Sequence, residues 1–168
     1  MTSNVVRVEA VCTSGQTRRV AKTPRPEALI EQFGLADDRH AGEWARPALP
    51  NRRQWSAVST DDVAAFCAEL GVPPFAPGAM GENLRLAGVA LGELRAGTLL
   101  EFPSGARLRV LAQNDPCQGA AGELAETYGE SVRRYFVKAA FGRRGVLGVV
   151  EATGIVRPGD EVRVLPPA

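Results

Sequence analysis

Hydrophobic and polar residues alternate in several short segments of the chain, a pattern typical of half-buried β-strands. In residues 5–12, the side chains of Val6, Val8 and Ala10 share one face, and charged side chains occupy the other. Residues 22–58 are broken up by proline, glycine and tryptophan, and they predict short strands joined by loops. The same alternation predicts four further strands, the first two of them paired as a hairpin, at residues 98–102, 106–112, 146–151 and 161–165.

One segment carries a clear helical pattern. Apolar side chains in residues 60–70 recur at the i, i+3, i+4 and i+7 spacing that lines one face of an α-helix. Ser59 or Thr60 is suited to cap its N-terminus, and Gly71 is suited to end it. Cys67 lies within the apolar face, which predicts a buried packing role rather than a chemical one.

A second helix is predicted over residues 121–140, although Gly129 weakens the pattern in its first half. Strands and helices do not alternate regularly along the chain, which argues against a doubly wound parallel sheet. Two similar units, at residues 95–102 and 157–164, each place a turn glycine before an alternating strand. Tight turns that feed short strands are typical of Greek-key and closed barrels. The sequence therefore predicts a mainly β, barrel-like fold with a few peripheral α-helices.

Composition narrows the class of protein. The 168 residues suffice for one domain with a sizeable core, and we expect residues 1–168 to form a single domain. Hydrophobic residues make up 45% and charged residues 23%, which is usual for a globular protein. The net charge of +1 argues against nucleic-acid binding, which needs a basic excess. No apolar run approaches the ~20 residues of a membrane span, and the first residues lack the pattern of a secretion signal.

The chain has three cysteines, which form no CxxC motif and no even framework. Such a sparse, odd set argues against disulfides and structural zinc, and it suits a reducing cytoplasm. Cys12 lies in a predicted strand and Cys67 in a helix face, so both are expected to be packing residues. Cys117 instead follows the second strand of the hairpin, in a loop before a predicted helix. A helix N-terminus favours the reactive thiolate, which would make Cys117 a functional thiol. The alternative is an exposed, inert cysteine.

Three further segments could carry chemistry. His40 is the only histidine and follows two aspartates and an arginine, although a lone histidine is more often structural. A loop at residues 77–84 presents Glu82 and Asn83 between glycines, and its alternative is a structural turn in which Asn83 bonds nearby backbone. Arg144 belongs to an arginine pair between glycines, which is suited to bind phosphate or carboxylate.

Taken in order, these motifs resemble the MOSC domain family. The family is related to the C-terminal part of eukaryotic molybdenum-cofactor sulfurase and also occurs as standalone bacterial proteins. The resemblance spans about residues 30–165 of this chain. The segments that carry it lie at residues 34–42, 77–84, 116–117, 143–146 and 154–160.

The resemblance implies a barrel-like domain in which Cys117 has the central role. In this family the cysteine is thought to carry sulfur as a persulfide, or to ligate molybdenum of a molybdopterin cofactor, and a soft thiolate suits both tasks. The resemblance implies catalytic roles for Cys117, His40 and Glu82. The cofactor-binding positions that it implies are Asp38, Arg39, Asn83, Asn114 and Arg144, the last suited to a pterin phosphate.

The chain departs from the family pattern in two places. Asp37 stands where the family usually has glycine, and the segment after Cys117 is small and apolar. The pyridoxal-phosphate half of the sulfurase has no counterpart within 168 residues. A standalone chain must therefore receive sulfur or cofactor from elsewhere, for example from a cysteine desulfurase. We expect a small-molecule substrate or cofactor as partner, with no nucleic acid and no membrane.

Three functions remain open at this stage. The first is sulfur or molybdenum-cofactor chemistry at Cys117, either as a sulfur relay or as a cofactor enzyme that reduces small N-oxygenated substrates. The second is a metal-independent enzyme of C–S bond chemistry, with Cys117 as persulfide donor or nucleophile and His40 or Glu82 as acid and base. The third is a non-catalytic barrel that serves as a binding module.

Overall fold

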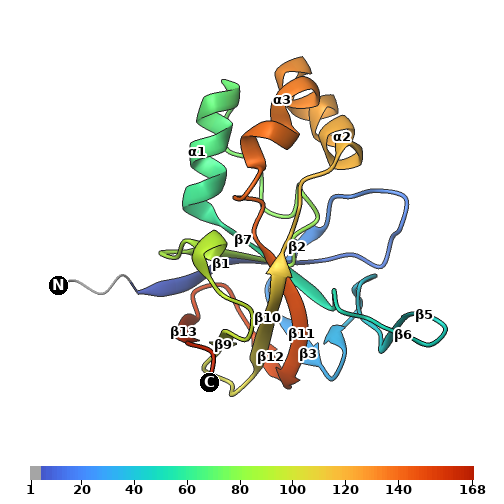
Figure 1. The fold of residues 1–168 in the computed structure, drawn as a ribbon, viewed down its shortest axis with the longest axis vertical. Helices are drawn as coiled ribbons and strands as arrows, with labels where there is room; N and C mark the ends of the chain where they lie inside the picture. The colour runs from blue at the N-terminus through green and yellow to red at the C-terminus, as the bar shows by residue number, and fades with distance from the viewer. Residues whose placement is uncertain (1–4) are drawn as a thin grey trace.

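A closed barrel forms one half of the structure, and three helices cover one end of it (Figure 1). The computed structural model describes residues 5–168; the sequence-based expectation about a secretion signal falls partly on residues 1–4, which lie outside them. Around the barrel the strands follow the order β13, β9, β10, β11, β7, β8 and β1, and β1 pairs with β13 to close it. All neighbours are antiparallel except β7 and β8, which run parallel. The predicted mainly β barrel is thereby confirmed.

The barrel strands lie in the segments that were predicted to form strands, except β8, for which the sequence predicted only the loop of residues 77–84. The alternating residues of the first strand bury their apolar face, and those of the hairpin pair through Leu108 and Leu100. The parallel pairing of β7 with β8 was not foreseen. The bounds are β1 (Val6–Thr13), β7 (Trp55–Ser59), β8 (Leu84–Ala87), β9 (Leu99–Glu101), β10 (Arg107–Gln113), β11 (Val146–Ala152) and β13 (Glu161–Leu165).

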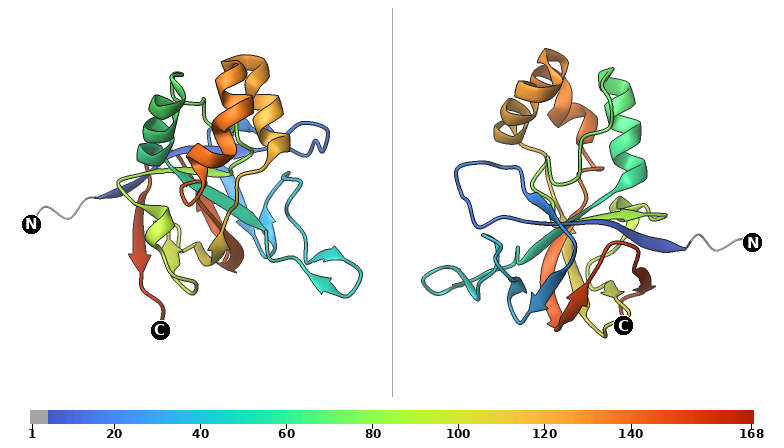
Figure 2. Two further views of the ribbon diagram at one scale, coloured as in Figure 1. Left: turned by 45° about the horizontal axis from the view of Figure 1, so that its top comes forward. Right: turned by 180° about the vertical axis from the view of Figure 1, so that it is seen from behind.

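Residues 22–58 form short strands, as predicted. One further short strand, β12, lies outside the segments in which strands were predicted. β2 (Thr23–Arg25) extends the barrel sheet beside β1. A three-stranded sheet combines β3 (Ala28–Glu31), β4 (Gly34–Leu35) and the unforeseen β12 (Gly154–Val156). A separate hairpin of β5 (Trp44–Arg46) and β6 (Leu49–Pro50) projects from the body of the molecule (Figure 2, left).

Local signals explain both ends of the first helix. α1 (Thr60–Leu70) begins after Ser59, whose hydroxyl accepts a hydrogen bond from the amide of Asp62 at 3.3 Å. Gly71 ends the helix in the left-handed conformation, with φ at 72°. The structure thus confirms the helix over residues 60–70 and assigns the cap to Ser59 rather than Thr60.

The single helix predicted over residues 121–140 is wrong. Two helices occupy this region, α2 (Gln118–Tyr128) and α3 (Glu130–Ala140), and they pack against each other. Gly129 separates them with φ at 100° and ψ at −177°, a conformation that glycine adopts without strain. The apolar period continues across the break, which is why periodicity alone did not reveal it. A short 3₁₀ turn, η1 (Leu91–Glu93), completes the elements.

The buried residues form two clusters, one inside the barrel and one under the helices. The barrel cluster surrounds Trp55 and Leu100, and the helical cluster surrounds the aromatic rings of Phe66, Phe75 and Phe136. Both helix faces and strand faces therefore have a core of their own. The boundary between the two clusters lies where strand ends and loops meet the N-termini of α1 and α2 (Figure 1).

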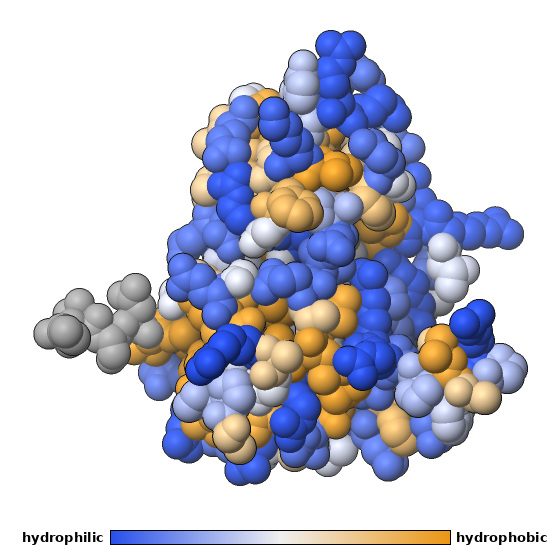
Figure 3. All heavy atoms as spheres, in the orientation of Figure 1, coloured by the Kyte–Doolittle hydropathy of each residue, from blue (hydrophilic) through white to orange (hydrophobic). Residues whose placement is uncertain are grey.

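On the face drawn in Figure 3, hydrophilic residues cover much of the surface, and hydrophobic residues show between them, most of all over the barrel half. Trp44 and Leu49 on the projecting hairpin are 55% and 42% exposed, whereas Trp55 is fully buried. No helix within residues 5–168 is long and apolar enough to span a membrane.

Candidate functional site

Cys117 lies at the boundary between the barrel and the helices. It is the N-cap residue of α2, it follows β10 by four residues, and it is exposed, whereas Cys12 and Cys67 are buried. Its side chain makes no capping hydrogen bond, and no acidic residue occupies the first turn of α2. The helix N-terminus therefore retains its partial positive charge beside the thiol.

A cavity of about 230 Å³ opens beside this cysteine. Its walls come from segments far apart in the sequence, including the loop of residues 14–22 that reaches α2 (Figure 1). The nonpolar wall includes Val20, Met80 and Ala120. Apart from the exposed Asp115, the polar or reactive side chains that line the cavity are Arg39, His40, Arg53, Asn114, Cys117 and Arg144.

Arg144 is held in the cavity wall with one end of its guanidinium group unpaired. The residue is 4% exposed, and its Nη2 donates to the carbonyl oxygen of Met80 at 2.6 Å. Its Nη1 is buried and has no hydrogen-bond partner. Burial lowers the pKa of Arg144, and the charge of Glu82 partly offsets this. An arginine nevertheless stays protonated, so the cavity carries a fixed positive charge.

Asn114 supplies a second buried donor without a partner. Its backbone amide donates to the carbonyl oxygen of Gly145 at 2.9 Å, which joins the end of β10 to the start of β11. Its side-chain Nδ2 is buried and unpaired. Within residues 5–168 four buried side-chain polar atoms lack a partner, and two of them, on Arg144 and Asn114, belong to this cavity.

A buried ion pair supports His40 from behind the cavity. The side chains of Lys22 and Asp38 have no exposed surface, and Nζ of Lys22 lies 3.0 Å from Oδ2 of Asp38. The same Nζ lies 2.8 Å from Nδ1 of His40. Because a lysine ammonium group only donates, Nδ1 must accept, and the ring proton lies on Nε2. His40 therefore offers an N–H donor rather than a base at Nε2.

The electrostatics of this trio support a neutral histidine. Burial lowers the pKa of Lys22 to about 8, against the attraction of Asp38, so the lysine stays charged at neutral pH. Asp38 acts to raise the pKa of His40, but burial and the charges of Lys22 and Arg53 outweigh it and lower the pKa. Burial acts to raise the pKa of Asp38, but His40, Lys22 and the amide of Ser14 outweigh it and lower the pKa.

The lowered pKa of Asp38 predicts a loss of stability in acid. The unfolded chain takes up this proton near pH ~3.9, and the folded chain takes it up at lower pH. The stabilisation is therefore complete above that value and is lost as the pH falls through and below it. We expect urea unfolding between pH 7 and 3 to show a shallower acid loss for Asp38→Asn than for the wild type. Equal slopes would contradict this origin.

Glu82 and Asn83 are fully buried and do not line the cavity. The carboxylate of Glu82 accepts hydrogen bonds from the amide of Met80 at 3.2 Å and from Arg85 at 2.9 Å. The side chain of Asn83 joins the amide of Ser56 to the carbonyl of Cys12. These contacts agree with the structural-turn alternative for Asn83, and both residues support the cavity wall rather than face a ligand.

The site contains residues that sequence reasoning missed. Lys22 and Arg53 were not singled out, and only their place in the folded chain brings them to His40 and Cys117. One signal was available, because Lys22 is one of only two lysines in a chain that otherwise uses arginine. Asp37 has φ at 62°, in the left-handed region, which accounts for the glycine expected there and which aspartate tolerates better than most residues.

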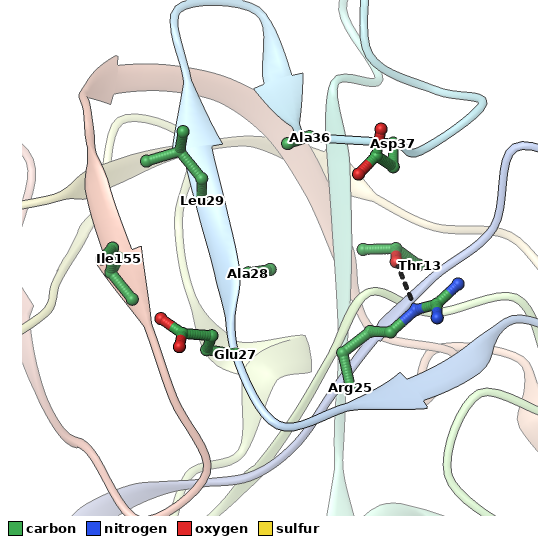
Figure 4. Close-up of a pocket in the computed structure, with 8 residues that line it drawn as sticks. All are labelled: Thr13, Arg25, Glu27, Ala28, Leu29, Ala36, Asp37 and Ile155. Atoms are coloured by element: carbon green, nitrogen blue, oxygen red, sulfur yellow. Dashed lines mark hydrogen bonds between the residues drawn. The ribbon is translucent and has the colours of Figure 1, made fainter.

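A larger cavity of about 550 Å³ lies elsewhere, between β1, β2, β3 and β12 (Figure 4). Arg25, whose Nε donates to Oγ1 of Thr13 at 3.0 Å, and Asp37 line it near Thr13, and Leu29 and Ile155 form part of its apolar wall. It holds no cysteine or histidine. The smaller cavity is therefore the candidate site, because it contains the exposed cysteine and two residues with unpaired donors.

Comparison with known proteins places the chain in a family. Residues 37–163 match the model of a family described as the MOSC domain. The chain is 37% identical over 118 residues to YuaD of Bacillus subtilis (strain 168), a protein named for metal–sulfur cluster biosynthesis, and the match covers 68% of this chain and 61% of that protein.

Two solved structures share the fold. The crystal structure of the Bacillus subtilis YUAD protein has a TM-score of 0.90 and 28% identity, covering 98% of this chain and 97% of that chain. YiiM from Geobacillus stearothermophilus has a TM-score of 0.72 and 18% identity, covering 95% and 75%. Since the family match spans most of its length, the chain belongs to the MOSC domain family.

Proposed function

We propose that this protein carries sulfane sulfur as a persulfide on Cys117 and delivers it in metal–sulfur or molybdenum-cofactor chemistry. The observation that carries the proposal is the place of the exposed Cys117, in a cavity lined by Arg39, Arg53, Arg144 and His40. Membership of the MOSC family and the name of the similar YuaD support the same class of chemistry.

The cavity suits an anionic sulfur group. A negative charge on Cys117 would raise the pKa of both Arg53 and Arg144, against the effect of burial, so both guanidinium groups lie within electrostatic reach of it. A persulfide anion on Cys117 would gain the same attraction. His40 adds an N–H donor, because Lys22 occupies its other ring nitrogen.

Loading requires only sulfur exchange. The Cys117 thiolate attacks the outer sulfur of a donor persulfide, a new S–S bond forms at Cys117, and the donor leaves as its thiolate. The reverse exchange delivers the sulfur to an acceptor thiolate. A cysteine desulfurase that carries a persulfide fits the donor role.

Persulfide loading provides the test. We expect the purified protein, incubated with polysulfide, to gain the mass of one sulfur atom on Cys117, and Cys117→Ser to gain none. Cys67→Ser is the matched control, because the Cys67 thiol lies on the buried face of α1. This variant should load like the wild type. Loading that persists in Cys117→Ser, or no loading of the wild type, would exclude the carrier role.

A bound molybdenum cofactor is the second candidate, favoured by the unpaired donors on Arg144 and Asn114. No group of three His, Cys, Asp or Glu side chains within residues 5–168 is arranged to hold a metal ion. The donor set still fits a cofactor that brings its own ligands: Cys117 would be a soft metal ligand, and Arg144 and Asn114 would bind oxygens. When bound, the group would supply two-electron redox chemistry. Molybdenum that copurifies with the wild type and is lost in Cys117→Ser would support this candidate.

A further inference from the structure

We propose that the cavity beside Cys117 binds a tetrahedral oxoanion that bears a sulfane sulfur, with thiosulfate as the simplest member, and that Cys117 takes its sulfur directly from this anion. The inference rests on the proposed function, because it names the sulfur source of the same cysteine. It assigns to Arg144 and Asn114 the binding of the leaving group.

The unpaired donors indicate what the ligand must offer. Arg144 and Asn114 both line the cavity, and Nη1 of the first and Nδ2 of the second are buried and lack an acceptor. Leaving a buried donor unpaired costs ~1–3 kcal/mol, and more when the group is charged. A ligand with at least two acceptor oxygens would satisfy both donors at once.

The charge of the wall selects an anion. Three guanidinium groups, on Arg39, Arg53 and Arg144, line the cavity together with one carboxylate, on Asp115; Arg53 and Asp115 are both exposed. The N-terminus of the 11-residue α2 adds amide groups that no side chain caps. These groups together would compensate the charge of a divalent anion. The protein as a whole would not attract anions, because its net charge is only +1.

The size of the cavity favours a small ion. Its volume of about 230 Å³ lies below the ~300–1,000 Å³ of pockets that enclose drug-sized ligands. Cys117 lines the same cavity as both unpaired donors. An anion whose oxygens bind Arg144 and Asn114 can therefore present its outer sulfur within the space that the thiol faces.

The transfer balances without another reactant. The Cys117 thiolate attacks the outer sulfur of thiosulfate, and an S–S bond forms at Cys117. The bond between that sulfur and the sulfonate sulfur breaks, and its electron pair leaves with sulfite. The products are the Cys117 persulfide anion and the sulfite dianion, and their total charge equals that of the reactants. Arg144 and Asn114 would stabilise the charge that develops on the leaving sulfite.

The experiment compares two sulfur donors on the same protein. Sulfite release and the mass of Cys117 are followed with thiosulfate, and loading from polysulfide, which has no oxoanion, runs in parallel. We expect Arg144→Met to slow loading from thiosulfate about 10- to 100-fold more than it slows loading from polysulfide, the equivalent of one charged hydrogen bond. The attraction of Arg144 for the persulfide is lost with both donors, whereas its hydrogen bond to the oxoanion is lost only with thiosulfate. Asn114→Leu should act in the same direction and serves as the second variant where Arg144→Met folds poorly.

Arg143→Met is the matched control. Arg143 neighbours Arg144 in sequence but pairs with Glu69 at 2.7 Å, away from the cavity, so its removal should leave both reactions unchanged. Loading of the wild type from polysulfide but not from thiosulfate would overturn this inference and leave the carrier role intact. Equal rates with thiosulfate in the wild type, Arg144→Met and Asn114→Leu would also overturn it. A wild type that loads from neither donor would exclude the carrier role itself.

Discussion

Lys22→Met is expected to lower the free energy of unfolding by about 3–5 kcal/mol, one of the two largest losses we predict. The substitution leaves the carboxylate of Asp38 buried without its counter-ion, since neither side chain of the pair has exposed surface. The amides of Ser14 and His40 still donate to Asp38, but they do not neutralise its charge. Urea or guanidinium unfolding at pH 7 measures the loss from the midpoint and slope.

The control and the double variant separate charge from packing. Lys138, the only other lysine, is exposed, so Lys138→Met should change stability by no more than about 0.5 kcal/mol. Adding Asp38→Asn to Lys22→Met removes the stranded charge and should recover part of the loss. A double variant as unstable as Lys22→Met alone would attribute the loss to packing instead.

Gly145→Ala is expected to destabilise the protein by about 3 kcal/mol or more, because steric overlap and an unfavourable backbone angle act together. Gly145 has φ at 101°, and an added Cβ would lie 1.9 Å from the carbonyl oxygen of Ala57. This contact is with the backbone of β7, directly beside the pairing of Val146 with Ala57 that joins β7 to β11 in the barrel. The overlap is relieved only if β7 and β11 move apart, and this would also displace the neighbouring Arg144.

Gly159→Ala isolates the backbone contribution. Gly159 has φ at 92°, but an added Cβ meets nothing within 4 Å. Its substitution should therefore cost only the ~1–2 kcal/mol of a left-handed residue with a side chain. Thermal unfolding of the two variants and the wild type makes the comparison. Similar losses in both variants would show that the overlap at Gly145 relaxes at little cost.

Local signals in the sequence were sufficient for most elements of the fold. α1 has a capping Ser59 and a terminating Gly71, and both act on their own neighbours, so their effect is readable from the sequence. The break at Gly129 was less accessible, because the apolar spacing continues through it. The closure of the barrel between β1 and β13 joins residues about 155 positions apart, and alternation does not specify such a partner.

The sequence indicated some residues of the candidate site and not others. Cys117 was identified by its loop position, and the resemblance implied His40, Asn114 and Arg144, which share its cavity. Lys22 was missed because its role depends on burial against Asp38, a contact made only in the folded chain. Glu82 was expected in the pocket, yet it supports the wall, since a sequence pattern does not tell which way a buried side chain faces.

The site lies where two separate cores meet, and this has a thermodynamic consequence. Ala120 and Met80 belong to the helical cluster, whereas Asn114 and Arg144 adjoin the ends of barrel strands, and all four line one cavity. A ligand that contacts both walls binds only when the helical layer is docked on the barrel. Its binding energy is then added to the cost of separating the layers, so occupancy would protect amides of both layers from hydrogen exchange together.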